Sequence, residues 1–143
     1  MNIGKNIKPR FILGETTYPI SCEIDNCIAP FGIDNAYGKM YMKVSIYDNG
    51  KLIHFLKNID DTISKLIMEK EQMSIESNIN RNTIQTILDN NIIIEDSNGK
   101  RLSSFNIVKS SPIKKIQMQL GDLYYITKSK KYAYKWIINK IIL

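Results

Sequence analysis

The hydrophobic pattern changes its period once in the first half of the chain, and this change limits the folds open to it. In residues 39–48, apolar residues occupy every second position. Met42 and Val44 fall on one side of this segment, and Tyr41 and Lys43 fall on the other. A period of two is typical of a β-strand with one buried face. We therefore predict a strand whose inner face is apolar and whose outer face is aromatic and basic.

After the turn at residues 48–50, apolar residues recur at spacings of three and four, which is typical of an amphipathic helix. They are Leu52, Phe55, Leu56, Ile59, Ile63, Leu66 and Ile67. The acidic residues between them, including Asp60 and Asp61, fall on the solvated side of this helix. The pattern therefore explains these carboxylates without a metal or a catalytic pair.

Further β-like segments surround this helix, separated by polar turns. We predict strands at residues 18–25, 92–95, 101–108, 114–120, 123–127 and 132–143. Residues 26–38, which contain Pro30 and Gly32, are expected to be irregular, and residues 71–91 fit either a short helix or a packed loop. In the last strand, alternation places Trp136, Ile138 and Lys140 on one face. Several strands with one long helix predict a mainly β (α+β) fold, a small closed or partly closed barrel.

The composition limits the kind of protein this is. The chain has 143 residues, enough for one domain with its own core, so we expect a single domain over residues 1–143. Apolar runs such as residues 92–94 and 141–143 are far too short to cross a bilayer, and residues 1–10 lack the apolar core of a signal peptide. We therefore expect a soluble, cytoplasmic protein that does not bind membranes.

Few residues are available for catalysis or for metal binding. Cys22 and Cys27 are the only cysteines and His54 is the only histidine, so neither a zinc site nor a disulfide framework is predicted. A Ser-His-Asp or Cys-His arrangement would depend on His54 alone, and His54 lies in the apolar run at residues 52–55. We predict no enzyme activity, no cofactor and no metal.

Positive charge is concentrated at the carboxyl end. Residues 109–143 hold eight lysines and one acidic residue, Asp122, whereas residues 1–108 hold twelve basic and thirteen acidic residues. Lys5, Lys8 and Arg10 add a short basic arm at the amino end. Such asymmetry is typical of a protein that meets a polyanion or an anionic surface.

Tyrosines are interleaved with these cations. Unpaired bases need flat π-faces on which to stack, and their phosphates need neutralising cations. The predicted nucleic-acid-binding residues are Lys39, Tyr41, Lys43, Tyr47, Lys114, Tyr124, Tyr125, Lys128, Lys130, Lys131, Tyr132, Tyr134, Lys135 and Trp136. A barrel with such a face has the oligonucleotide-binding (OB) architecture, so we expect a five-stranded OB-like barrel with one long amphipathic helix and a short basic N-terminal arm.

The pattern does not assign every ring to the surface. Trp136 suits the core as well as a stacking platform, because Ile138 shares its face. Tyr132 and Tyr134 fit either role equally, whereas Tyr41 lies between two lysines opposite methionines, which favours contact with bases.

Two ends of the chain resemble a known protein family. The matching segments are residues 18–20, 29–33 (including Pro30-Phe31-Gly32), 37–46 and 55–60 at one end, and residues 124–127 and 132–136 at the other. These resemble the single-stranded DNA-binding family of the cytoplasmic linear plasmids of yeasts and of related large cytoplasmic DNA viruses. Residues 71–106 match this family poorly. The resemblance implies an OB fold, non-enzymatic coating of displaced strands during protein-primed replication, and recognition of terminal repeats.

Two other functions compete with this interpretation. The lysines alone would also fit an interaction or scaffold protein that docks an acidic partner or an anionic surface, but that function leaves the interleaved tyrosines without a purpose. A nuclease would need converging carboxylates, and Asp60, Asp61, Glu69, Glu95 and Asp96 fall on a solvated helix face or in a turn. Single-stranded DNA is thus the predicted partner, and RNA, further copies of the chain and replication proteins are left open.

Overall fold

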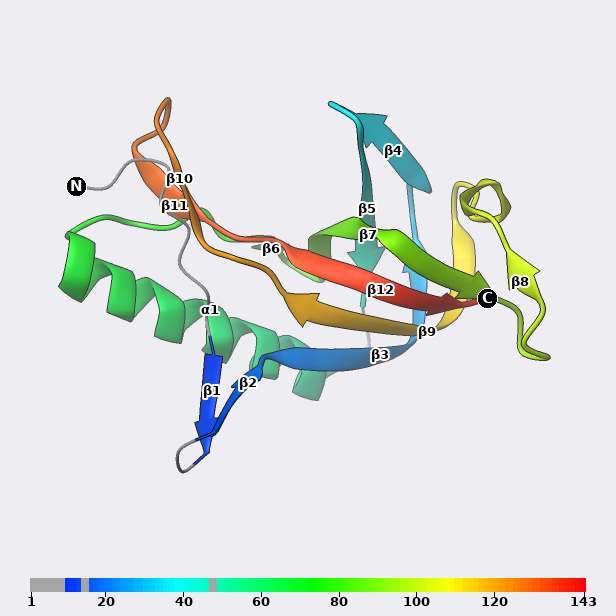
Figure 1. Ribbon diagram of the computed structural model, residues 1–143, viewed down its shortest axis with the longest axis horizontal. Coiled ribbons are helices and arrows are strands. Elements are labelled where there is room, and N and C mark those ends of the chain that lie inside the picture. The colour runs from blue at the N-terminus through cyan, green and yellow to red at the C-terminus, as the bar shows by residue number, and fades with distance from the viewer. Residues whose placement is uncertain (1–9, 14–15, 47–48) are drawn as a thin grey trace.

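Five strands close into a barrel at the centre of the molecule (Figure 1). The computed structural model describes residues 10–13, 16–46 and 49–143. The barrel strands are β3 (Ser21–Ala29), β5 (Lys39–Ser45), β7 (Thr83–Glu95), β12 (Trp136–Ile142) and β9 (Ser111–Leu120). Each strand pairs with the next in this order, and β9 pairs with β3 to complete the ring. Only the β7–β12 pairing is parallel. The predicted mainly β, OB-like barrel is confirmed.

Alternate residues of these strands fill the barrel. Met42 and Val44 of β5 are buried, as the period of two predicts, and they meet Ile24, Ile84 and Ile116 from the neighbouring strands. Burial of such side chains contributes about 1.5 to 3 kcal/mol each to folding. The intervening β5 residues face outward, so the strand presents its polar face to solvent.

The alternation predicted for the last strand is wrong beyond Ile138. The pairing of β12 with both neighbours shifts register between Ile138 and Lys140, and opposite β9 this leaves one extra residue on β12. Ile141, rather than Lys140, therefore continues the buried face of Trp136 and Ile138. The Lys140 ammonium instead lies 3.1 Å from a carboxylate oxygen of Glu95.

The predicted amphipathic helix is α1 (Gly50–Glu71). It begins where the Asn49 side chain accepts a hydrogen bond from the Leu52 N–H, 3.2 Å away. It ends at Gln72, which adopts a left-handed conformation and donates its N–H to the Met68 carbonyl. Leu56, Ile63 and Ile67 are buried, so the helix packs one apolar stripe against the barrel.

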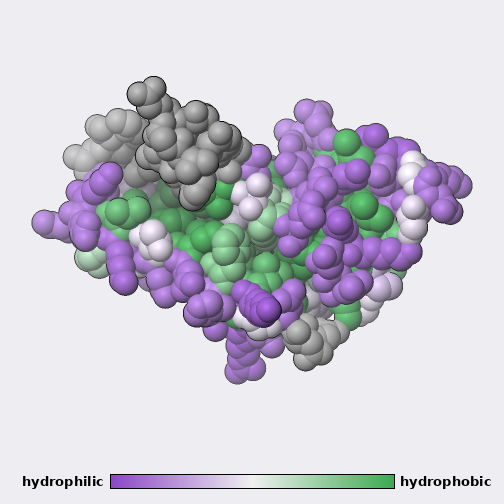
Figure 2. Space-filling model, turned by 90° about the horizontal axis from the view of Figure 1, so that it is seen from below, coloured by the Kyte–Doolittle hydropathy of each residue, from purple (hydrophilic) through white to green (hydrophobic). Residues whose placement is uncertain are grey.

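The exposed edge of the apolar stripe of α1 lines an apolar hollow. It has a volume of about 320 Å³ and is bordered by Ile20, Phe55, Ile59 and Leu66, among others. Figure 2 shows hydrophobic side chains gathered between polar margins on the lower face of the molecule. Phe55 and Leu66 are 42% and 48% exposed. Part of the helix stripe is therefore open to solvent.

Two segments that were expected to be irregular or helical are strands. Within residues 26–38, β3 runs on to Ala29, and β4 (Ile33–Ala36) forms a hairpin with β5. Residues 71–91, expected to form a helix or a loop, instead contain β6 (Ile79–Asn80) and most of β7. The two ends of β7 are rich in β-branched residues and pair with β5 and β12, whereas Asn90 and Asn91 lie between these stretches and pair with neither strand.

The remaining short elements differ from the predicted strands mainly at their ends. The expected strand at residues 18–25 is split at Ile20 between β2 (Thr16–Pro19) and β3, and β1 (Arg10–Leu13) pairs with β2. The strand expected at residues 101–108 is reduced to β8 (Arg101–Leu102) and a short 3-10 helix, Ser104–Asn106. The chain between β9 and β12 folds into a second hairpin, β10 (Tyr124–Ile126) and β11 (Lys131–Ala133).

Parts of the sequence-based prediction lie outside the described residues. They are Lys5 and Lys8 of the basic arm, and Tyr47. Within the described ranges, no helix is both long and apolar enough to span a bilayer.

Candidate nucleic-acid interface

The floor of the candidate site is the outer face of β5 and β7. Tyr41 lies opposite Ile87 in this strand pair, and Lys43 lies opposite Gln85. Since successive residues of a strand point to opposite faces, Lys39, Tyr41 and Lys43 share the face away from the buried Met42. Lys39 and Lys43 are exposed and Tyr41 is half-buried. The predicted basic and aromatic face of this strand is therefore present.

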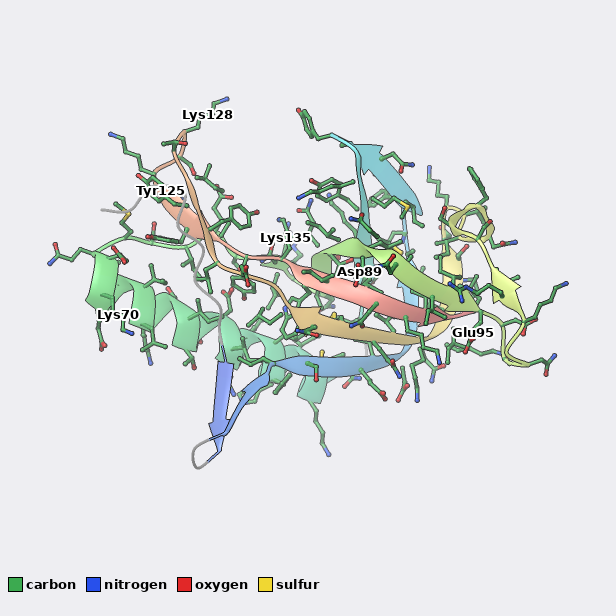
Figure 3. All side chains as sticks on the ribbon, in the orientation of Figure 1. Lys70, Asp89, Glu95, Tyr125, Lys128 and Lys135 are labelled. Carbon is green, nitrogen blue, oxygen red and sulfur yellow. The ribbon has the colours of Figure 1, made fainter. Side chains whose placement is uncertain are left out.

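Two hairpins rise from the barrel on the same side and flank this floor (Figure 1). One is formed by β4 and β5, and the other by β10 and β11. Lys128, Lys130 and Lys131 are exposed in the second hairpin, and Figure 3 shows Lys128 at its tip. The hairpin thus carries three of the predicted cations on the side of the barrel that bears the floor.

Tyr124 connects this hairpin to the floor. The pKa of Tyr124 is raised, first by partial burial and then by the nearby Tyr41 phenol and the Glu76 carboxylate. Two rings that are far apart in the sequence therefore lie near each other. Because the pKa of Tyr124 lies above the ordinary value of 10.0, its phenol carries no negative charge at physiological pH that would repel phosphate.

A buried asparagine holds a lysine at the foot of the same hairpin. The Lys135 ammonium donates a hydrogen bond to Asn78 Oδ1 at 2.9 Å, and the Asn78 amide nitrogen donates to the Tyr134 carbonyl. Burial lowers the pKa of Lys135, and the Glu76 carboxylate partly opposes this effect. Figure 3 shows Lys135 between the β10–β11 hairpin and β7. Its ammonium is thus partly desolvated, which strengthens its attraction for an anion.

Two hollows beside β5 are lined by several residues that the sequence patterns did not select. A cavity of about 540 Å³ is lined by Phe31, Lys43, Ser77, Asn78, Asn80, Arg81, Thr83 and Gln85. A smaller one of about 260 Å³ shares Phe31, Lys43 and Gln85 and adds Tyr41 and Asp34, among others. The Lys43 ammonium lies 5.6 Å from the centre of the Phe31 ring, within the range of a cation–π contact. The two hollows are adjacent, because they share Phe31, Lys43 and Gln85, and together we call them the groove.

Phe31 and Arg81 could have been noticed in the sequence. Phe31 stands between Pro30 and Gly32, a setting that predicts an exposed turn, and it is 64% exposed. Arg81 stands between two asparagines and adopts a positive φ of 58° in the turn between β6 and β7. In both cases the local turn signal was present, but the neighbouring strand was not predicted.

Three of the predicted stacking rings belong to the core, so their assignment to the binding surface is corrected. Tyr132, Tyr134 and Trp136 are at most 2% exposed. The Tyr134 hydroxyl donates to Asp60 Oδ1 of α1 at 2.6 Å, and the Tyr132 ring packs 5.5 Å from that of Tyr125. Their faces are covered by protein atoms and cannot receive a base. Tyr125 is half-buried by the same packing.

Lys114 does not join the other cations. It lies on β9, which is paired with β3 and β12 and not with either strand of the floor. Its ammonium donates to the Ser97 hydroxyl. Lys115 is paired with Glu23 and Asp25 at 3.5 and 3.9 Å. The basic tail is therefore divided between the groove and other sides of the barrel.

The acidic residues that a nuclease would need have other contacts or lie in solvent. Asp60 accepts the Tyr134 hydroxyl, Glu95 pairs with Lys140, and Asp96 accepts two backbone N–H groups of its own turn, each at 2.9 Å. Asp61 and Glu69 are exposed on α1. No cluster of three or more His, Cys, Asp or Glu suited to a metal ion occurs among the described residues.

The comparisons with known proteins identify a structural neighbour but no relative by sequence. No protein family model matches the chain, and no curated protein matches it. The crystal structure of gp2.5, a single-stranded DNA-binding protein encoded by bacteriophage T7, superposes with a TM-score of 0.60 at 12% identity. The match covers 87% of this chain and 86% of gp2.5. At this level of identity, the likeness establishes a shared fold.

Proposed function

We propose that this protein binds single-stranded DNA in the groove between its two hairpins, without catalysis. The observation that carries the proposal is a basic and aromatic face on β5 and β7: Tyr41 and Lys43 line its hollows, and Lys135 donates a hydrogen bond to Asn78, which lines the larger one. Stacking contributes about 1 to 3 kcal/mol per base, and each neutralised phosphate adds salt-dependent affinity. In OB folds this strand face and the flanking loops are the usual oligonucleotide site. The shared fold with gp2.5 supports the proposal.

The recessed position of the rings favours a single strand over a duplex. Phe31 and Tyr41 line hollows rather than a flat surface, and a base must leave a helical stack before it can reach such a ring. Paired bases in a duplex have no free face. We therefore expect preference for single strands without strong sequence selectivity.

Within a cell, such a protein would coat strands displaced during DNA replication in the cytoplasm. Sequence resemblance to the linear-plasmid and viral family motivates this role, and it remains a prediction. Binding to RNA, to replication proteins and to further copies of the chain also remains open.

The proposal is tested with a fluorescently labelled oligothymidine of about 16 nucleotides, a length within the usual site size of OB folds. Fluorescence anisotropy should give tighter binding to the single strand than to a duplex of the same length, with affinity falling as salt rises. Equal affinity for duplex, or no binding at low salt, would contradict the proposal. In that case an acidic protein partner becomes the better explanation of the exposed lysines.

Absence of catalysis is checked with the same oligonucleotide. A labelled strand incubated with the pure protein and Mg²⁺ or Mn²⁺ should stay intact, because phosphodiester hydrolysis normally requires a metal held by converging carboxylates. Protein-dependent cleavage would contradict a purely binding function.

A further inference from the structure

The tip of the β4–β5 hairpin has an unusual residue for its backbone geometry. Ala36 pairs with Lys39, so only Tyr37 and Gly38 form the turn, and their φ angles are 54° and 74°. A two-residue turn with both φ angles positive is a type I′ turn, which strongly favours Asn-Gly. Gly38 fits this preference, whereas the bulky Tyr37 is disfavoured at positive φ.

Packing does not explain the tyrosine either. Tyr37 is 98% exposed, the highest value among the large apolar side chains that the structure describes. A ring that is so fully solvated contributes almost no burial energy to the fold. The residue therefore lowers the stability of the hairpin without a compensating contact to the part of the chain that the structure describes. Local strain of this kind is found preferentially at functional sites.

The position of the hairpin supplies a role for the ring. The hairpin forms one wall of the groove and rises on the same side of the barrel as β10 and β11 (Figure 1). Its strand β5 continues from the turn directly into Lys39 and Tyr41 of the floor. A DNA strand that runs along β5 and leaves the floor would next meet the turn at residues 37–38. A solvated ring at this turn is available for stacking on a base, because it need not first leave a packed position within the protein.

We propose that Tyr37 stacks on a base at the exit of the groove and is kept at this turn for binding, at the expense of stability. This inference rests on the proposed binding of single-stranded DNA. It adds a contact residue beyond the floor and makes a distinctive prediction. One substitution should improve folding and impair binding together, whereas an ordinary destabilising mutation would impair both.

The test compares Tyr37→Asn with Tyr37→Phe. Asn suits the type I′ turn and has no ring, so Y37N should unfold at a higher urea concentration than the wild type while its affinity for a 16-nucleotide oligothymidine falls at least about fivefold. Y37F keeps both the ring and the unfavourable backbone, so its urea midpoint and its affinity should match those of the wild type. Phe105→Ala is the matched control. Phe105 is an 89% exposed ring between β8 and β9, outside the groove, and its loss should leave affinity unchanged.

Oligonucleotide length locates the contact. With a strand of about four nucleotides, which fills only the floor, Y37N and the wild type should bind equally. If Y37N bound the 16-nucleotide strand as tightly as the wild type does, this inference would be overturned, and the proposed function would stand. An unchanged or lowered urea midpoint for Y37N would contradict the assignment of strain to Tyr37. Failure of the wild type itself to bind single strands would instead defeat the proposed function.

Discussion

At the scale of single residues, Tyr41 is the ring best placed to receive a base. It lines the groove, it lies beside Tyr124, and it is half-buried on a face that carries Lys43. Partial burial fixes the ring without covering it, which reduces the side-chain entropy that binding must overcome.

Replacing Tyr41 by Ala should weaken binding to oligothymidine by about 1 to 3 kcal/mol, because one stacking contact is lost. The dependence of affinity on salt should stay the same, since no cation is removed. Titrations at several salt concentrations measure both quantities. Tyr41→Phe is the control and should bind as the wild type does. Full affinity in Tyr41→Ala would exclude this ring from the platform.

Tyr134, unlike Tyr41, has a structural role in the core. Its hydroxyl joins the hairpin region to α1 through Asp60. Burial raises its pKa, and the hydrogen bond to Asp60 and the charges of Asp60 and Asp61 raise it further. The phenol thus remains a donor at any physiological pH.

Tyr134→Phe should lower the free energy of unfolding by about 1 to 3 kcal/mol, because the Asp60 carboxylate loses a donor while the ring still fills its space. Urea denaturation measures this change. Affinity for single strands should be unchanged under conditions in which the variant is folded. A loss of affinity with unchanged stability would return Tyr134 to the binding surface.

Lys135 makes binding sensitive to alkaline pH. Its pKa lies below the ordinary value of 10.5 because burial disfavours the charged form. As pH rises through this lowered pKa, Lys135 loses its proton before an exposed lysine does, and its attraction for phosphate is lost. The effect on folding has the opposite sign. The unfolded chain keeps the proton to higher pH, so in this window the contribution of Lys135 to stability increases as pH rises.

Affinity measured from about pH 7 to about pH 10 should therefore fall earlier in the wild type than in Lys135→Arg, because arginine stays protonated throughout this range. Lys128→Arg is the matched control, since Lys128 is exposed at the hairpin tip, and it should keep the wild-type profile. Identical profiles for the wild type and Lys135→Arg would show that Lys135 does not contact phosphate.

At the scale of elements, the β10–β11 hairpin supplies charge more than it supplies rings. Lys130 and Lys131 are exposed there, whereas Tyr132 in the same hairpin is buried. The hairpin is held to the segment that follows α1, because the Tyr132 backbone forms hydrogen bonds with Ser74 and Glu76. Its lysines are thus carried on a hairpin that is fixed to the rest of the fold.

Replacing Lys130 and Lys131 together by Ala should reduce the slope of log affinity against log salt by about 1 to 2, because fewer counterions are released on binding. The control removes the same charge elsewhere, by replacing Lys65 and Lys70, which are exposed on α1, and should leave the slope nearly unchanged. An equal reduction in both double variants would indicate a diffuse field rather than a phosphate path along the hairpin.

The sequence predicted those elements whose own residues determine their structure. The spacing of Leu56, Ile63 and Ile67 is enough to define α1, and the alternation through Met42 and Val44 is enough to define β5. By contrast, β7 is a strand because β5 and β12 pair with its two edges. Its first part does alternate, with Ile84, Thr86 and Leu88 buried, but the polar run at residues 89–91 interrupts this pattern, so β7 was not predicted in full.

At the scale of the whole molecule, the interface is assembled by closure of the barrel. Closure brings Tyr124 near Tyr41 and places Lys135 against Asn78, and none of these pairs is close in sequence. Sequence patterns did identify Tyr41, Lys43, Tyr124 and Lys135 as candidates. They did not separate these from Tyr132, Tyr134, Trp136 and Lys114, because whether a side chain faces the groove depends on register, on packing and on which strands are neighbours.

The described pairings around the ring of strands differ in extent. Strands β3 and β9 are paired along most of their length, whereas the described pairing of β3 with β5 is that of Ile28 with Ser45. The β4–β5 hairpin, with Tyr37 at its tip, is joined to the barrel through the pairing of β5 with β7 at residues 41–45 and 83–87. A base that stacks on this hairpin would therefore be anchored through the same two strands that form the floor.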